Sequence, residues 1–125
     1  MGLKIYSSTL NLGDGLSRAV GKRLNEIPAD GVCGVVFCGT SDEMEYHSLL
    51  DSLKNAVHAS LGRQIPVTLI PQYLLPQGGL SLDIYALDGP STARFEVRDG
   101  VCYGVIEGEK EKMLFVEGVP ASNFA

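Results

Sequence analysis

The stretch PVTLIPQYLLPQGGLSLDIYALD, residues 66–88, decides how the rest of the chain is arranged. It holds two apolar runs, Val67–Leu75 and Leu80–Leu87, whose residue types suit a pleated and buried surface. The turn-forming residues Pro76–Gly79 separate the runs, so the pattern predicts a strand, a turn or large bulge, and a second strand. Pro71 cannot donate a hydrogen bond to a sheet, which places the first strand at an edge or breaks it at a bulge.

Polar side chains interrupt these runs and are the candidates for contact with a ligand or with another subunit. They are Thr68, Gln72, Gln77, Ser81 and Asp83. The alternative is that these side chains form only the solvent-facing side of two alternating strands.

Length and composition limit the classes of protein to which the chain can belong. Its 125 residues, 45% of them hydrophobic, predict one domain over residues 1–125 with a single core. The formal charge of −5, without a cluster of Lys or Arg, argues against binding to nucleic acid. No apolar run approaches the roughly 18 residues that span a membrane, and the first residues lack the pattern of an export signal. We therefore expect a cytoplasmic protein without membrane contact.

Cysteine and histidine spacing does not indicate a disulfide framework or a metal site. The three cysteines, Cys33, Cys38 and Cys102, are an odd number and lack the CxxC or Cys/His spacing of zinc sites. The expected role of Cys33 and Cys38 is that of small buried apolar residues. His47 and His58 are eleven positions apart and cannot act as an adjacent pair. The sequence predicts no metal and no cofactor.

The remaining apolar patterns predict an α+β fold. Apolar residues at helical spacing predict helices over residues 14–27 and 42–61. Further strands are predicted over residues 3–10, 32–38, 95–98, 101–106 and 113–119, the last three forming an antiparallel tail with Asp99–Gly100 as a hairpin turn. Two helices on one face of a mixed sheet would bury both apolar stripes together. Because no third helix is predicted, another copy of the chain is expected to cover part of the other face.

The predicted helix EMEYHSLLDSLKNAVHASLG, residues 43–62, and the residues after it resemble the RidA (YjgF) family. The similarity continues in Pro66-Val67-Thr68, in Leu75-Pro76 and in Leu80-Ser81-Leu82-Asp83. Ile70-Pro71-Gln72 also resembles the related chorismatase branch, which cleaves the enolpyruvyl ether of chorismate. The resemblance implies a RidA/chorismate mutase-like packing of two helices on one sheet face and a homotrimer. The best-known members of the family hydrolyse enamine and imine intermediates.

The resemblance also implies that two catalytic positions are changed. The arginine with which the family clamps a substrate carboxylate corresponds to Thr68, and the strand acid that positions the attacking water corresponds to Ser81. Thr68 cannot supply the two charged N–H donors of a guanidinium, and Ser81 cannot act as a base without a partner. Asp83 matches the second acid of that strand.

The order of elements departs from the family as well. The family's antiparallel strands come first, whereas here the hairpin strands come last. Residues 114–118, LFVEG, are similar to an early strand of the family, with Glu117 where Ser is usual. The strand order is therefore expected to be permuted, or the chain is one half of a tandem protein whose partner half would follow.

Three functional interpretations stay open, and none assigns a catalytic residue. The first is a non-catalytic RidA-like domain that forms an oligomer and binds a small metabolite between subunits. The second is an enzyme acting on a small carboxylate metabolite, an enamine or imine deaminase or a chorismatase-like enzyme, with Arg63, Arg94, Asp83 or Glu117 as substitutes. Arg63 is alternatively only a cation beside a helix C-terminus. The third is the structural half of a larger two-domain enzyme.

Overall fold

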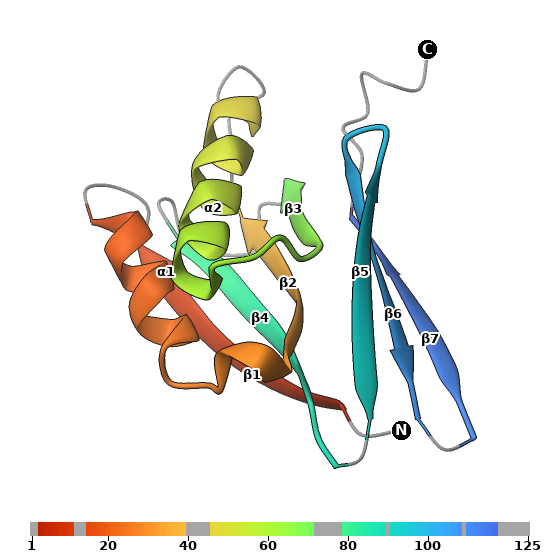
Figure 1. Ribbon diagram of the computed structural model, residues 1–125. Coiled ribbons are helices and arrows are strands. Elements are labelled where there is room, and N and C mark those ends of the chain that lie inside the picture. Colours follow the sequence, from red (N-terminus) through yellow and green to blue (C-terminus); the bar gives the residue numbers. More distant parts are fainter. Residues whose placement is uncertain are drawn as a thin grey trace.

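Two helices, a mixed sheet and an antiparallel sheet form three layers in the computed structural model (Figure 1). The structure describes residues 3–11, 15–39, 46–71, 79–89, 91–108 and 110–117. In chain order the elements are β1 (Leu3–Asn11), α1 (Leu16–Leu24), a short 3-10 helix (Ala29–Gly31), β2 (Val32–Gly39), α2 (Tyr46–Leu61), β3 (Val67–Pro71), β4 (Gly79–Leu87), β5 (Thr92–Arg98), β6 (Val101–Glu107) and β7 (Lys112–Val116). The predicted α+β class is confirmed.

The middle layer is a four-stranded sheet in the order β1-β4-β2-β3. Strand β4 runs antiparallel to β1 and to β2, whereas β3 runs parallel to β2. A parallel pair needs a crossover connection, and α2 is that crossover. The strand that ends at Pro71 lies at the edge of the sheet, as its proline predicts.

Both helices lie on one face of the mixed sheet, and the main core fills the space between them (Figure 1). The helices contribute Val20, Leu24, Leu53 and Val57, none more than 1% exposed, and Phe37 of β2 packs among them. These helical residues recur at three or four positions, so one stripe of each helix faces the sheet. Among the described residues, no helix combines the length and the apolar character needed to cross a membrane.

Glycines mark one end of each helix. Gly15, with φ of 86°, precedes α1, which spans less than the predicted range of 14–27. Gly62, with φ of 73°, follows α2, and its N–H donates to the His58 carbonyl at 2.8 Å. This left-handed glycine ends the helix at the predicted residue. The predicted start of that helix, residues 42–45, lies outside the described residues.

The third layer is the antiparallel sheet β5-β6-β7, which confirms the predicted three-stranded tail. Asp99 and Gly100 form its first turn with φ of 52° and 77°. The sheet packs on the helix-free face of the mixed sheet, where the Phe115 ring lies 5.2 Å from the Tyr85 ring and touches the Gly34 position. The chain's own strands cover this part of the face, and a second copy over the rest of it stays a prediction.

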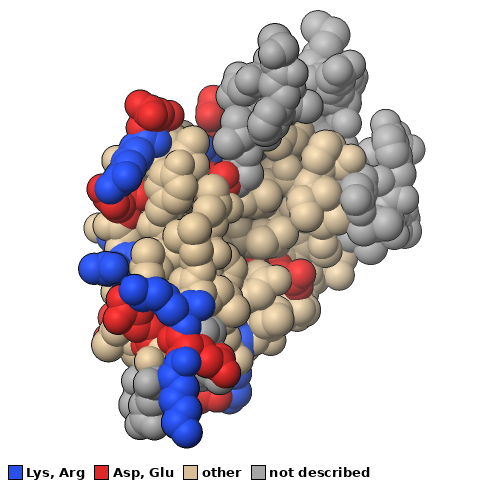
Figure 2. All heavy atoms as spheres, turned by 90° about the vertical axis from the view of Figure 1, so that its right-hand side faces the viewer, with Lys and Arg blue, Asp and Glu red and all other residues tan. Residues whose placement is uncertain are grey.

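Figure 2 shows the molecule from the side of the antiparallel sheet. Charged side chains gather along one margin of this view, and β5 carries ion pairs from Arg98 to Glu96 and from Arg94 to Glu107. Much of the remaining surface in this view is uncharged. On β7, Leu114 is 60% exposed and Val116 is 48% exposed.

The end of β2 gives a test of the packing in the middle layer. A Cβ at Gly39 would lie 2.8 Å from the carbonyl oxygen of Gly79, and backbone cannot move aside as a flexible side chain can. Replacing Gly39 by alanine is therefore expected to lower the free energy of unfolding by about 1–3 kcal/mol. Urea unfolding followed by circular dichroism measures this change. Gly31→Ala is the control, because a Cβ there meets nothing within 4 Å, and equal losses in both variants would contradict the prediction.

Candidate functional site

Two of the predicted site residues fall in one row across the mixed sheet. The register places Ser7 opposite Asp83, Asp83 opposite Val36, and Val36 opposite Thr68. We call these four residues the cross-strand row. The neighbours of Asp83 in β4 are buried against the helices, so the alternation of side chains directs the row to the helix-free face.

Short hydrogen bonds order the polar groups on this face. The Ser7 hydroxyl donates to Oδ1 of Asp83 at 2.6 Å. Ser81 lies in the next row, and its hydroxyl donates to the carbonyl oxygen of Cys38 at 3.1 Å. Thr68, Ser81 and Asp83 are all half-buried. They lie on one face of the sheet, whereas Gln72 lies outside the described residues.

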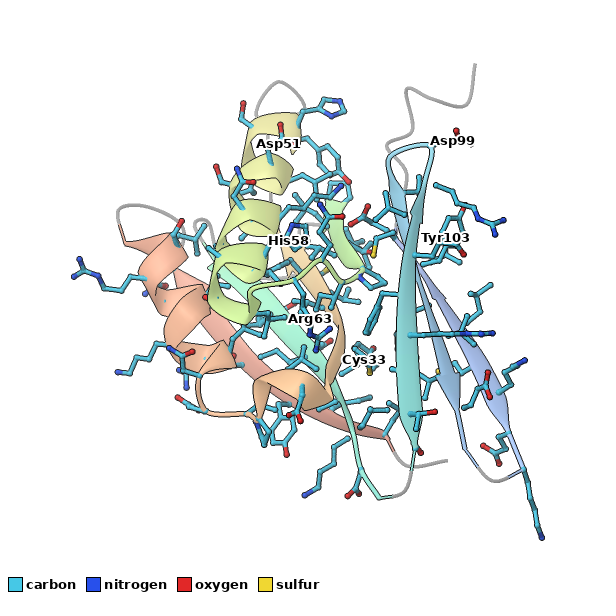
Figure 3. The ribbon with its side chains drawn as sticks, viewed as in Figure 1. Cys33, Asp51, His58, Arg63, Asp99 and Tyr103 are labelled. Carbon is cyan, nitrogen blue, oxygen red and sulfur yellow. The ribbon has the colours of Figure 1, made fainter. Side chains whose placement is uncertain are left out.

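The two candidate arginines bind elsewhere. Nη2 of Arg63 donates to the Val32 carbonyl at 2.6 Å, and its guanidinium lies 5.1 Å from the centroid of the Phe95 ring. Figure 3 shows Arg63 between α2 and β5. Val32 lies opposite Ala86, three residues of β4 from Asp83, which at about 3.3 Å per residue is about 10 Å from the cross-strand row. Arg94 is 73% exposed and pairs with Glu107 at 3.6 Å.

Glu117 follows β7 and is a buried link between all three layers. Only 4% of it is exposed. Its Oε1 accepts from the Val67 N–H at 3.1 Å, and its Oε2 accepts from the Cys102 N–H at 3.3 Å. Nζ of Lys54 on α2 lies 3.1 Å from the same Oε2. These contacts give Glu117 a structural role. It also lines the pocket described next, so its selection from sequence as a ligand-binding or catalytic candidate stays a prediction.

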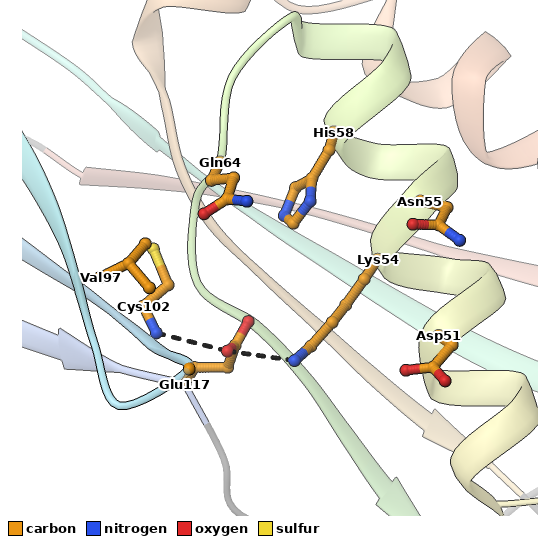
Figure 4. A pocket seen from close by; sticks show the side chains of 9 residues that line it. Asp51, Lys54, Asn55, His58, Gln64, Val97, Cys102 and Glu117 are labelled. Carbon is orange, nitrogen blue, oxygen red and sulfur yellow. Dashed lines mark hydrogen bonds and ion pairs between the residues drawn. The ribbon is translucent and has the colours of Figure 1, made fainter.

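A pocket of about 380 Å³ lies between α2 and the β5–β6 hairpin (Figure 4). We call it the α2 pocket. Helix α2 supplies Asp51, Lys54 and His58, and the hairpin supplies Val97, Gly100 and Cys102. The spacing of the three helical residues, at i, i+3 and i+7, was a sequence signal for a shared polar face. Sequence reasoning missed the pocket because its two walls are some 40 residues apart in the chain.

Two cysteines are buried as protonated thiols. Burial raises the pKa of Cys33 and of Cys102 from 9.0 to about 11, and Cys33 donates to the Tyr85 carbonyl at 3.2 Å. Cys33 is buried as predicted, whereas the predicted burial of Cys38 is wrong, because Cys38 is half-buried. Cys102 shares the α2 pocket with His58, but a thiol with this pKa is not a ready nucleophile. Within the described part of the chain, no three His, Cys, Asp or Glu side chains are placed to hold a metal ion.

No protein-family model, curated protein or solved structure matches this chain. The resemblance to RidA therefore stays a prediction from the sequence. The function has to be argued from the cross-strand row and from the contacts described above.

The structural role of Glu117 predicts a large loss of stability on its removal. Glu117→Ala would leave two buried N–H groups and the Lys54 ammonium without their acceptor. The free energy of unfolding, measured with urea, is expected to fall by about 3 kcal/mol. Glu107→Ala is the control, because Glu107 is 45% exposed and should contribute less than about 1 kcal/mol. Similar losses in the two variants would show that Glu117 is not a structural link.

The raised thiol pKa values predict slow alkylation of the native protein. At pH 8, a pKa of 9.0 leaves about a tenth of a thiol as thiolate, and a pKa of about 11 leaves about a thousandth. Iodoacetamide should therefore modify Cys33 and Cys102 at least about 100-fold more slowly in the native chain than in urea. Peptide mass spectrometry over time measures both rates, and equal rates would contradict the assignment. Because folding raises both pKa values, their contribution to stability is complete below pH 9 and is lost as the pH rises towards 11.

Proposed function

We propose that this chain is a RidA-like domain that assembles with copies of itself and binds a small polar metabolite between them without converting it. The observation that carries the proposal is the cross-strand row, with Asp83 and Thr68 on one face of the sheet. These side chains are half-buried and Ser7 is exposed, so the described layers of the chain leave them accessible. A second copy on this face would complete an enclosed site.

The order of the elements supports the family assignment within this proposal. In it, β1 to β4 with their two helices correspond to the helix-bearing part of a RidA/chorismate mutase-like domain. Strands β5 to β7 correspond to the antiparallel strands that come first in the family, which here are permuted to follow β4 or belong to a tandem arrangement. The exposed Leu114 and Val116 on edge strand β7 support assembly, because exposed apolar surface is common at subunit contacts.

The chemistry of the cross-strand row favours binding over catalysis. Asp83 supplies the one carboxyl group of the row, and the Ser7 hydroxyl donates to one of its oxygens. The Ser81 hydroxyl donates to a backbone carbonyl, so its proton is engaged. Thr68 is a neutral residue at a position where a carboxylate substrate would need a cation. The enzyme alternative requires Arg63 or Arg94 beside Asp83 or Glu117, and both arginines have other partners.

Assembly through this face is tested by light scattering on matched variants. The natural chain is expected to have three times the 13.4 kDa mass of a monomer. Ser7→Arg places a bulky cation on the exposed end of the cross-strand row and should convert the trimer to monomers without unfolding it. Ser17→Arg on α1 is the control, because it makes the same change on the helical side. A monomeric natural chain, or a trimer that tolerates Ser7→Arg, would contradict the proposal.

The absence of turnover is measured separately on the natural chain. We expect ammonia release from a short-lived 2-imino acid to be no faster with the protein than in buffer. A rate that increases in proportion to protein concentration would favour the enzyme alternative instead.

A further inference from the structure

Strands β1 and β7 each form the outer edge of a sheet. Strand β1 ends the order β1-β4-β2-β3, and β7 ends the order β5-β6-β7 at the right-hand margin of Figure 1. Within the described part of the chain, no strand pairs with the outer side of either one. Such an edge presents a row of backbone N–H and C=O groups with which another chain can pair.

Lys112, Leu114 and Val116 direct their backbone groups to the outer edge of β7. The Glu117 N–H, just beyond this strand, donates to the Cys102 carbonyl at 3.0 Å, so Glu117 faces β6. Successive residues of a strand direct their N–H and C=O groups to opposite sides. The positions that alternate with Glu117 therefore face away from β6.

Leu3, Ile5 and Ser7 direct their backbone groups to the outer edge of β1. The Val35 N–H donates to the Pro66 carbonyl at 3.0 Å, so the odd-numbered residues of β2 from this point on face β3. The even-numbered residues of β2 then bond to odd-numbered residues of β4, and the even-numbered residues of β4 bond to even-numbered residues of β1. The odd-numbered residues of β1 are left to face outward.

The outer edge of β3, by contrast, is already occupied. The Val67 N–H donates to Glu117, and the Leu69 carbonyl accepts from the Tyr46 hydroxyl at 2.7 Å. Pro71, the next residue on this edge, has no N–H to donate. Strand β5 forms part of a wall of the α2 pocket. Strands β1 and β7 are therefore the edges best suited to pairing with another chain.

The side chains on these two edges match each other in type. Leu114 is 60% exposed and Ile5 is 57% exposed, so each edge carries an apolar side chain in contact with water. Antiparallel pairing of β7 with β1 of a second copy can place Leu114 opposite Ile5 and Val116 opposite Leu3. Both residues of each pair then direct their backbone groups to the shared edge, and their side chains project to the same face. Backbone hydrogen bonds and apolar contacts form together in this register.

We propose that the subunits assemble by antiparallel pairing of β7 of one copy with β1 of the next, with Leu114 opposite Ile5. This inference rests on the assembly proposed above and specifies the contact through which it forms. Lys112 of one copy then lies opposite Ser7 of the next, so the neighbouring copy contributes a side chain at the exposed end of the cross-strand row. Because two different edges meet, the contact is head-to-tail and generates a ring of copies instead of a two-fold dimer.

The contact is tested by disulfide trapping in the full chain. The Cα atoms of directly opposite residues in a hydrogen-bonded pair lie about 5.5 Å apart, which a disulfide can bridge. A chain with Ile5→Cys and Leu114→Cys, oxidised with glutathione disulfide, is expected to give covalent dimers and trimers on a non-reducing gel. Ile5→Cys with Met113→Cys is the matched control and should stay monomeric on the gel, because Met113 projects to the other face of β7. The natural chain controls for its own three cysteines.

Two results of the trapping experiment would overturn the proposal. Covalent dimers from Leu114→Cys alone would show that β7 pairs with β7 of a second copy about a two-fold axis. Equal crosslinking in the Met113→Cys control would show that the cysteines meet by random collision.

A reversal of charge tests the register. Ser7→Arg should break the trimer because the new cation meets Lys112 of the neighbour. Adding Lys112→Glu should restore a mass of three times 13.4 kDa in light scattering, whereas adding Lys110→Glu, which precedes β7, should not. If Lys112→Glu fails to restore this mass, or if a trimeric natural chain gives no trapping in its cysteine variant, the β7–β1 contact is wrong and the proposed assembly still stands. A monomeric natural chain contradicts both.

Discussion

The arrangement of the three layers depends on one buried carboxylate. Glu117 accepts hydrogen bonds from the backbone of β3 and of β6 and pairs with Lys54 of α2, so a single side chain contacts the middle sheet, the antiparallel sheet and the helices. A buried charge is tolerated only when its oxygens are satisfied, and two N–H donors and an ammonium meet that condition here. The same contacts fix the distance between α2 and the hairpin, which creates the α2 pocket.

The position of the antiparallel sheet determines which part of the mixed sheet stays accessible. Phe115 packs on Tyr85 and fills the space over Gly34, where a Cβ would lie only 3.3 Å from the Phe115 ring. Further along β2, Val36 lies in the cross-strand row, where the described residues are half-buried or exposed. One face of one sheet is thus divided into a structural part and a part available to a ligand or a second copy.

Local patterns predicted much of this fold. Because Pro71 cannot donate a hydrogen bond to a sheet, the sequence predicted that β3 lies at an edge. The Asp99–Gly100 pair predicted the hairpin turn, and the apolar repeat up to Leu61 predicted the end of α2. The alternation in β4 also showed that Ser81 and Asp83 share a face. These signals are readable because they depend on residues a few positions apart.

Contacts between distant segments could not be predicted in the same way. No periodicity indicates that Glu117 reaches Val67, fifty positions away, or that Arg63 donates to the start of β2. From sequence, a polar residue between apolar strands is equally consistent with a ligand-binding role and with a buried structural role. Only the packing of the layers against one another distinguishes these two roles. The same limit applied to the α2 pocket, whose helical wall was visible in the spacing of Asp51 and His58 but whose second wall was not.

The division of charges connects these structural roles with the expected ligands. Lys54 and Arg63 both hold elements together, one through a carboxylate and the other through a backbone carbonyl and an aromatic ring. Asp83, by contrast, has only a neutral hydroxyl as its described partner, and Asp51 stands on an exposed helix face. The cationic side chains near the candidate sites therefore hold elements of the fold together, and the carboxylates of Asp83 and Asp51 remain to bind a ligand. A chain built in this way should select ligands that donate hydrogen bonds or carry positive charge, because a carboxylate ligand would meet repulsion without a cation to offset it.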